Sequence, residues 1–325
     1  MNRNELLQII ADSKIFQHWH WFRWHFKHPL YGHPNVLADS IIEACLTCEA
    51  RIPGYAERTI SLVASLGGRE KHRPDWEQLL QVLAELLVVS HILRLDWDAS
   101  TTFEAEPSVS RQGKNPEILV RDPHITLAVE VKAPALFSYQ ENRSKNPEQI
   151  AARFASHGQL HELLRDPNKA TLPRDNPVKD FLISAQNKFE QFKGENNFVS
   201  ALVIVWDDYI YEPLSALLHP NSGLLTEHSF YRDENGTPIK FESVGAVVLI
   251  RQLHQFMLAC QNEALVDDVS GPLQYDIADG FPPKAILRNR VSDEQFGRLC
   301  QIFLASPPDP NMGAEYTPKE LIWWL

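Results

Sequence analysis

The sequence predicts an α/β fold in which helices flank a mixed β-sheet. Apolar residues recur at helical spacing over residues 76–93, and they alternate with polar residues over residues 125–132, as in a strand. Two near-continuous apolar runs, at residues 198–206 and 244–250, are typical of strands buried on both faces. This alternation of helical and strand patterns indicates a sheet covered by helices.

Length and composition agree with a globular chain. The 325 residues are 44% hydrophobic and 22% charged, which is enough apolar material for a sizeable core. The net charge of −11 argues against a protein that coats nucleic acid by charge alone, because phosphate binding depends largely on Lys and Arg. Neither a membrane-length apolar run nor a secretory signal pattern is visible, and four cysteines give no disulfide framework. We therefore expect a cytoplasmic protein that does not contact a membrane.

The pattern of apolar and turn-forming residues divides the chain into three segments. Residues 1–75 have the pattern of helices broken by prolines and a Gly-Gly pair, residues 76–250 alternate helical and strand patterns, and residues 251–325 are helical again. The expected organisation is an N-terminal helical extension, a central core and a C-terminal helical extension.

The first helix of the central core is expected from Trp76 to about Leu93, with Asp75 as its N-cap. Three strands that form a meander follow it, at residues 101–106, 116–121 and 125–132. The turn Asp122-Pro123-His124 joins the last two strands into a hairpin. A second helix and two buried strands complete the order, at residues 177–193, 198–206 and 244–250.

Glu130 and Lys132 share one face of the third expected strand, about 7 Å apart along the chain. Glu117 opens the preceding strand, and the hairpin turn folds it back toward the Glu130 end. Two carboxylates and a strand carbonyl can hold Mg²⁺ through hard oxygen ligands, and a nearby ammonium can orient an attacking water. This arrangement suits metal-assisted hydrolysis of a phosphodiester. The alternative is an exposed ion pair between Glu130 and Lys132, which would contribute little to stability.

Pro116-Glu117-Ile118, followed by Glu130-Val131-Lys132-Ala133-Pro134, resembles the motif of the PD-(D/E)XK nuclease superfamily. The element order over residues 76–206 resembles the αβββαβ core of that restriction-endonuclease-like fold. The resemblance implies that Glu117, Glu130 and the carbonyl of Val131 are metal ligands and that Lys132 is the catalytic lysine. It adds two further expectations: a first-helix glutamate that reaches the metal, either Glu77 or Glu85, and a site glutamine on the second helix, Gln186. Glu117 departs from the Asp of the family, and its extra methylene lengthens the reach to the metal.

The sequence thus predicts a Mg²⁺-dependent endonuclease, with Mn²⁺ as a substitute ion, that cuts DNA. A role in bacterial defence or mobile-element biology is an expectation at the level of the fold alone. Two alternatives stay open: a catalytically inactive scaffold of the same fold that binds a partner protein, and a nuclease that cuts RNA with the same site. The acidic composition indicates either a local basic groove or a homodimer or larger complex that brings the nucleic acid.

Two other stretches have competing interpretations. Residues 17–28 interleave aromatic side chains with His and Arg, a pattern that favours packing or a dimer surface over nucleic-acid contact or a His-metal site. Just beyond the third expected strand, three residues are candidates to meet substrate phosphates: Tyr139, Arg143 and Lys145.

Overall fold

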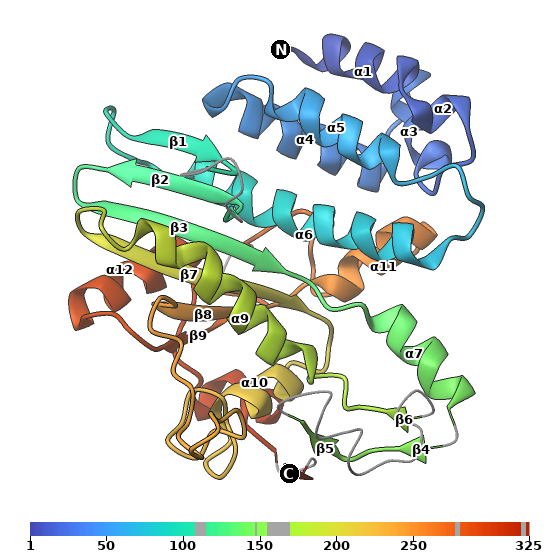
Figure 1. Cartoon of the computed structure of the whole chain (residues 1–325). Helices are drawn as coiled ribbons and strands as arrows, with labels where there is room; N and C mark the ends of the chain where they lie inside the picture. Colours follow the sequence, from blue (N-terminus) through green and yellow to red (C-terminus); the bar gives the residue numbers. More distant parts are fainter. Residues whose placement is uncertain (108–114, 147, 155–169, 277–279, 320–322, 325) are drawn as a thin grey trace.

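The computed structural model of the chain describes residues 1–107, 115–146, 148–154, 170–276, 280–319 and 323–324 (Figure 1). A six-stranded mixed sheet lies at its centre in the order β1-β2-β3-β7-β8-β9. The strands are β1 (Thr102–Ala105), β2 (Ile118–Asp122), β3 (Ile125–Lys132), β7 (Phe198–Trp206), β8 (Ala246–Arg251) and β9 (Ala285–Arg288). The first three form an antiparallel meander, β7 and β8 continue parallel to β3, and β9 closes the edge antiparallel to β8. The predicted α/β class, with helices around a mixed sheet, is confirmed.

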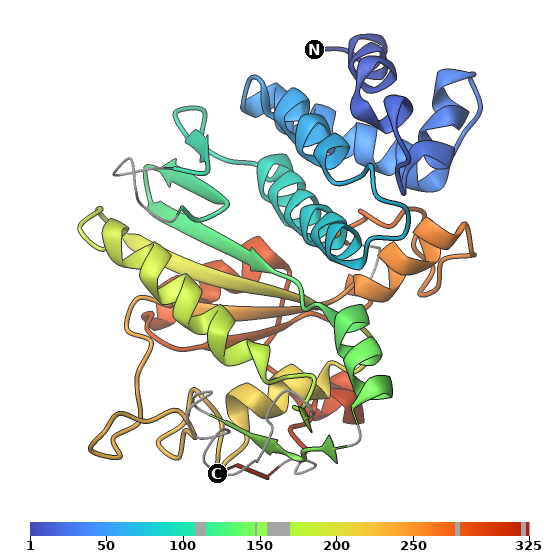
Figure 2. The same cartoon turned by 45° about the vertical axis from the view of Figure 1, so that its right-hand side comes forward.

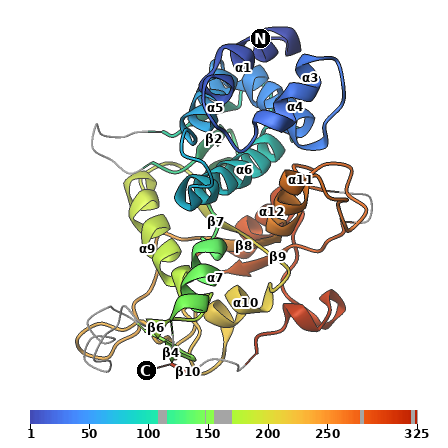
Figure 3. The same cartoon turned by 90° about the vertical axis from the view of Figure 1, so that its right-hand side faces the viewer.

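Helices cover both faces of this sheet. The helix α9 (Pro177–Phe189) lies on one face, and α6 (Arg73–Arg94) and α11 (Leu253–Gln261) lie on the other (Figure 3). Because β3 and β7 are parallel, the chain must cross from one end of the sheet to the other, and α9 makes this crossover. The helix expected over residues 177–193 ends earlier, at Phe189, and continues as the short 3-10 helix η2 (Glu190–Phe192).

The helix α6 begins at Arg73 rather than at Trp76, and Asp75 is not its N-cap. His72 occupies the cap position, and Asp75 lies in the first turn, where a carboxylate interacts favourably with the helix dipole and pairs with His72 at 3.0 Å. Among the described helices, α6 is the one long and apolar enough to cross a membrane, yet 78% of its apolar window is buried inside the protein. It is a core helix, and most of its surface is covered by the sheet and by other helices.

The N-terminal segment covers the side of α6 that faces away from the sheet (Figure 2). Its helices are α1 (Arg3–Asp12), α2 (Lys14–Gln17), α3 (Arg23–Leu30), α4 (Val36–Arg51) and α5 (Tyr55–Ser65). The aromatic stretch at residues 17–28 packs into this layer: Phe22 and Phe26 are fully buried, and the His20 imidazole bonds the carbonyl of Val63 at 2.9 Å. Packing is therefore confirmed for Phe22 and Phe26, while Trp24 of the same stretch is 48% exposed.

The C-terminal segment is not wholly helical, which corrects the prediction. It contains α11, α12 (Asp293–Phe303) and the 3-10 helices η4 (Pro310–Met312) and η5 (Ala314–Tyr316), but it also supplies β9 to the central sheet. A strand of four residues is too short to show a period in the sequence. One apolar core runs through all three segments, from Leu6 to Tyr316.

Two insertions flank the carboxyl ends of β3 and β7. After β3 come α7 (Leu136–Lys145) and three strands of two residues: β4 (Glu148–Gln149), β5 (Ala152–Arg153) and β6 (Ala170–Thr171). The strand β4 pairs with β6, and β5 pairs with β10 (Trp323–Trp324). After β7 comes α10 (Tyr211–Leu218).

Candidate functional site

The β2–β3 hairpin brings Glu117 to Glu130. Ile118 pairs with Val129 in the antiparallel register, so Glu117, one residue earlier, stands opposite Glu130. The backbone N–H of Glu117 donates to the carbonyl of Val129 at 2.9 Å, which extends the ladder to this position. The two carboxylates therefore start from adjoining points of the sheet.

Glu130 is completely buried and is held by two ammonium groups. The Nζ atoms of Lys132 and Lys188 each lie 2.7 Å from its Oε1 atom, and Lys188 also donates to Oε2 at 2.7 Å. The exposed-pair interpretation of Glu130 and Lys132 is wrong, because the glutamate is 0% exposed. A carboxylate at such a depth requires opposite charge beside it, since burial without a partner costs several kcal/mol or more.

Lys188 also contacts the second carboxylate. Its Nζ atom lies 3.6 Å from Oε1 of Glu117, so one ammonium from α9 touches both glutamates. Sequence reasoning missed this residue, although a signal was present: Lys188 follows the inward-facing Ala185 by three positions, which puts it at the edge of the buried face of α9.

Gln186, which the resemblance implied for the site, faces elsewhere. Its side chain accepts a hydrogen bond from the backbone N–H of Ser243 at 2.7 Å and donates to Glu190 at 3.2 Å. Two residues correspond to about 200° around a helix, so Gln186 and Lys188 cannot reach the same point. The expected helix was right, and the expected residue on it was not.

Glu85 and Glu77, the two candidates on α6, have separate environments. The Glu85 carboxylate accepts a bond from the Gln81 amide at 2.8 Å and interacts electrostatically with Glu117 and Glu130. Glu77 accepts bonds from the backbone N–H and the hydroxyl of Ser138, at 2.7 and 2.5 Å, in the first turn of α7. Only Glu85 is on the side of the two strand glutamates, and Glu77 caps α7 instead.

Gln81 connects α6 to the end of β3. Its amide nitrogen donates to the carbonyl of Val131 at 2.9 Å as well as to Glu85, and its oxygen accepts from the N–H of Ala133 at 2.7 Å. The Val131 carbonyl, expected as a metal ligand, is thus already hydrogen-bonded through one of its two lone pairs.

A cavity of about 260 Å³ opens beside Glu85 and Glu117. Side chains of α5, α6 and the end of β1 form its walls: Tyr55, Arg58, Thr59, Leu62, Val82, Val89, Ala105 and Glu106. Glu85 and Glu117 therefore face a space that can admit water and a substrate group, whereas the buried Glu130 is not among its lining residues.

Burial dominates the protonation of this cluster. Burial, together with the negative charges of the neighbouring glutamates, raises the pKa of Glu117 to about 8 and that of Glu85 to about 7. Lys188 and Lys132 act in the opposite direction without cancelling the effect. At neutral pH the raised pKa values favour the protonated carboxyl of Glu117 and leave Glu85 near the midpoint of its titration.

The donor set fits a hard divalent cation. The Oε1 atom of Glu130 is buried beside two ammonium groups but is in hydrogen-bonding geometry with neither. This oxygen therefore accepts no hydrogen bond. Over the residues that the structure describes, no group of three His, Cys, Asp or Glu side chains is arranged to hold a metal. Mg²⁺ needs only one or two carboxylates because it keeps several waters, whereas structural zinc takes four protein ligands. Two carboxylates are a donor set that Mg²⁺ can use with water as its remaining ligands.

Comparison of the chain with protein-family models, with curated proteins and with solved structures found no match. The chemistry of this cluster therefore has to be inferred from its own residues.

Proposed function

We propose that this chain is a Mg²⁺-dependent nuclease of the PD-(D/E)XK superfamily that cuts DNA. The observation that carries the proposal is the convergence of Glu117 and Glu130, from adjoining strands, on one ammonium beside Lys132. The order α6, β1 to β3, α9, β7 supports it, because it is the αβββαβ order of the restriction-endonuclease-like core.

Glu117 and Glu130 would hold the ion in this proposal, and Glu85 borders the same space. The ion would supply a bound water of lowered pKa and would stabilise charge on the phosphate oxygens. Lys132, fixed at 2.7 Å from Glu130, orients the attacking water and offsets negative charge at the phosphate. Attack forms a new phosphorus–oxygen bond and breaks the bond to the leaving oxygen, which yields a phosphate monoester and a hydroxyl group.

The net charge of −11 bears on how DNA would be held. Overall repulsion makes binding depend on local cations or on a homodimer or larger complex that presents the DNA. Arg58 is a cation in the wall of the carboxylate cavity and belongs to such a local set. A cytoplasmic location and a role in defence or mobile-element biology remain part of the proposal at the level of the fold.

The test is a cleavage assay with the purified chain, single- and double-stranded DNA and RNA, and Mg²⁺ or Mn²⁺. Glu130→Gln and Lys132→Ala are each expected to lower the rate about 100-fold or more, as removal of a group that stabilises the transition state does. Lys193→Ala, which changes an exposed lysine directly after η2, is the control and should leave the rate unchanged. Intact DNA and RNA in every form tested, with no effect of Lys132→Ala, would overturn the proposal.

The second candidate is an inactive scaffold of the same fold. It is favoured by the charge pairing already present, since two lysines offset Glu130 and the Val131 carbonyl is bonded to Gln81. Titration with Mn²⁺ separates the two: a nuclease gains thermal stability that Glu130→Ala abolishes, and a scaffold gains none. The RNA arm of the cleavage assay decides between DNA and RNA as the substrate.

A further inference from the structure

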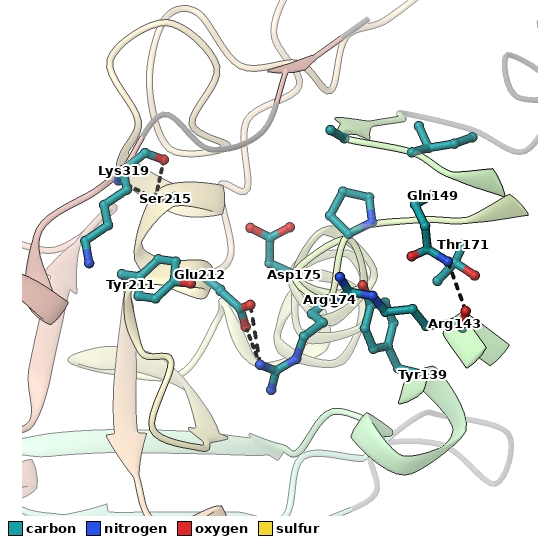
Figure 4. A pocket seen from close by; sticks show the side chains of 13 residues that line it. Tyr139, Arg143, Gln149, Thr171, Arg174, Asp175, Tyr211, Glu212, Ser215 and Lys319 are labelled. Atoms are coloured by element: carbon teal, nitrogen blue, oxygen red, sulfur yellow. Dashed lines mark hydrogen bonds and ion pairs between the residues drawn. The ribbon is translucent and has the colours of Figure 1, made fainter. Parts of the chain in front are cut away.

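A second cavity, of about 350 Å³, lies beyond the carboxyl ends of β3 and β7 (Figure 4). It is formed by α7, α10 and the insertion strands, together with Lys319 near the end of the chain. None of its lining residues belongs to the carboxylate cavity. In open α/β sheets, the carboxyl ends of parallel strands are the usual place for a ligand, and this volume suits a small molecule.

Around this cavity four cations stand against three carboxylates, because Arg174 is shared by Glu212 and Asp207. Its two carboxylates are already paired: Asp175 with the buried Arg153 at 2.5 Å, and Glu212 with Arg174 at 3.3 Å (Figure 4). Across the described residues, the guanidinium of Arg143 and the ammonium of Lys319 have no carboxylate partner. The cavity is therefore suited to an anion.

Aromatic rings lie beside these cations. Tyr139 and Tyr211 both line the cavity, and the Nζ atom of Lys319 lies 4.2 Å from the centre of the Tyr211 ring. A tyrosine face accepts a flat ring of any base type, since every base has a π-face. Cations and aromatic faces in one cavity match a ligand that carries both a phosphate and a planar base.

The walls of the cavity are held in place by contacts outside it. Glu77 of α6 caps the first turn of α7 through Ser138, which fixes the helix that carries Tyr139 and Arg143. Arg174 pairs with Asp207, directly after β7, and with Glu212 on α10. Such pre-arranged side chains lower the entropy that binding would otherwise cost.

We propose that this cavity is a nucleotide-binding site, with the phosphate at Arg143 and the base on Tyr139 or Tyr211. The nucleotide is either free or an unpaired residue of a nucleic-acid strand. The second source rests on the proposed function, because a nuclease would bring a strand to this edge of the sheet.

Calorimetric titration of the full chain with adenosine 5′-monophosphate tests the site. The nucleotide is expected to bind more tightly than adenosine or inorganic phosphate alone. Arg143→Ala should weaken binding about tenfold, and Tyr139→Ala about fivefold. Lys145→Ala is the matched control, since Lys145 lies on the same helix, pairs with Glu141 and does not line the cavity.

A ten-nucleotide single strand, titrated in the presence of a chelator, separates the two sources. Binding of the strand but not of the free nucleotide, lost in Arg143→Ala, assigns the site to a strand residue; binding of the free nucleotide assigns it to a small ligand. If neither probe loses affinity in Arg143→Ala and Tyr139→Ala, the site is overturned. Glu130→Gln should abolish cleavage and leave nucleotide binding intact, so the nuclease proposal and this one fail separately.

Discussion

At the scale of single residues, Lys188 sets the charge balance of the carboxylate cluster. Its ammonium contacts Glu130 and Glu117, so Lys188→Met leaves the buried Glu130 with Lys132 alone. We expect the metal-free variant to lose about 3 kcal/mol or more of unfolding free energy, as when one partner of a buried pair is removed. We also expect Mn²⁺ to raise its melting temperature more than in the wild type, because the ammonium of Lys188 then no longer competes for the two carboxylates. Asn187→Ala, at an exposed neighbouring position, is the control, and equal effects in both variants would contradict this role.

His91 determines part of the pH dependence of stability. Its imidazole is buried, stacks on Tyr275 and lies 2.7 Å from the carbonyl of Ile302. Burial lowers the pKa of His91 to about 4; the bonded carbonyl and Asp276 raise it, and the positive charges of Lys284 and Arg94 lower it. The unfolded chain, with a histidine pKa of about 6.5, takes up the proton first. Stability is therefore complete above about pH 6.5 and falls as the pH drops, by about 3 kcal/mol at pH 4.

Urea unfolding at pH 7 and pH 4 measures this effect of His91. The variant His91→Gln can still donate to the Ile302 carbonyl but does not titrate, so it should lose about 3 kcal/mol less than the wild type over this range. Glutamates and aspartates elsewhere titrate in both proteins and cancel in the comparison. Parallel losses in the two proteins would show that His91 is not the responsible group.

At the scale of elements, the strength of the sequence pattern decided what could be predicted. The bounds of β3 and β7 agree with the expected strands at 125–132 and 198–206, because strict alternation and a continuous apolar run both end sharply. The strand β9 was not predicted, because four residues are too few to show a strand period. The start of α6 was misplaced because Asp75 is a residue type that often caps helices, but it lies in the first turn of α6.

The part of the candidate site that lies on the β2–β3 hairpin could be predicted from the sequence. Glu117, Glu130 and Lys132 come together through β2 and β3, whose register follows from the turn between them. Lys188 could not be chosen over Gln186, because the choice depends on how α9 is rotated over the sheet. That rotation is set by packing between elements, which no local pattern encodes.

Gln81 is the contact through which α6 orders the end of β3. In Gln81→Met, the N–H of Ala133 and the Val131 carbonyl lose their partner, at an expected cost of about 1–3 kcal/mol. The proposed cleavage should slow as well, since Lys132 lies between these two residues. Gln78→Met changes an exposed glutamine one turn away on the same helix and should alter neither quantity. Thermal unfolding and the cleavage assay together check this, and an unaffected Gln81→Met would contradict it.

At the scale of the whole molecule, the three segments expected from sequence texture share one core. Apolar residues of the first helices, of the sheet and of α12 belong to the same cluster of buried side chains. The segments were recognised from local helix and strand patterns in the sequence. A shared core depends instead on which apolar faces of the helices and the sheet pack against one another. The segments can therefore be recognised in the sequence without being separable in the protein.

Removal of residues 1–65 tests whether the N-terminal helices can be separated from the core. These helices cover α6, in which 14 of 22 residues are buried. Without them, one flank of this apolar helix would face water, and an exposed apolar patch of several hundred Å² promotes aggregation. We expect residues 66–325 to aggregate or to lose cooperative urea unfolding, as measured by circular dichroism, while the full chain unfolds in one transition. A soluble, cooperatively unfolding fragment would mean that the central segment is a domain of its own and that the covering helices serve another purpose, such as binding a partner.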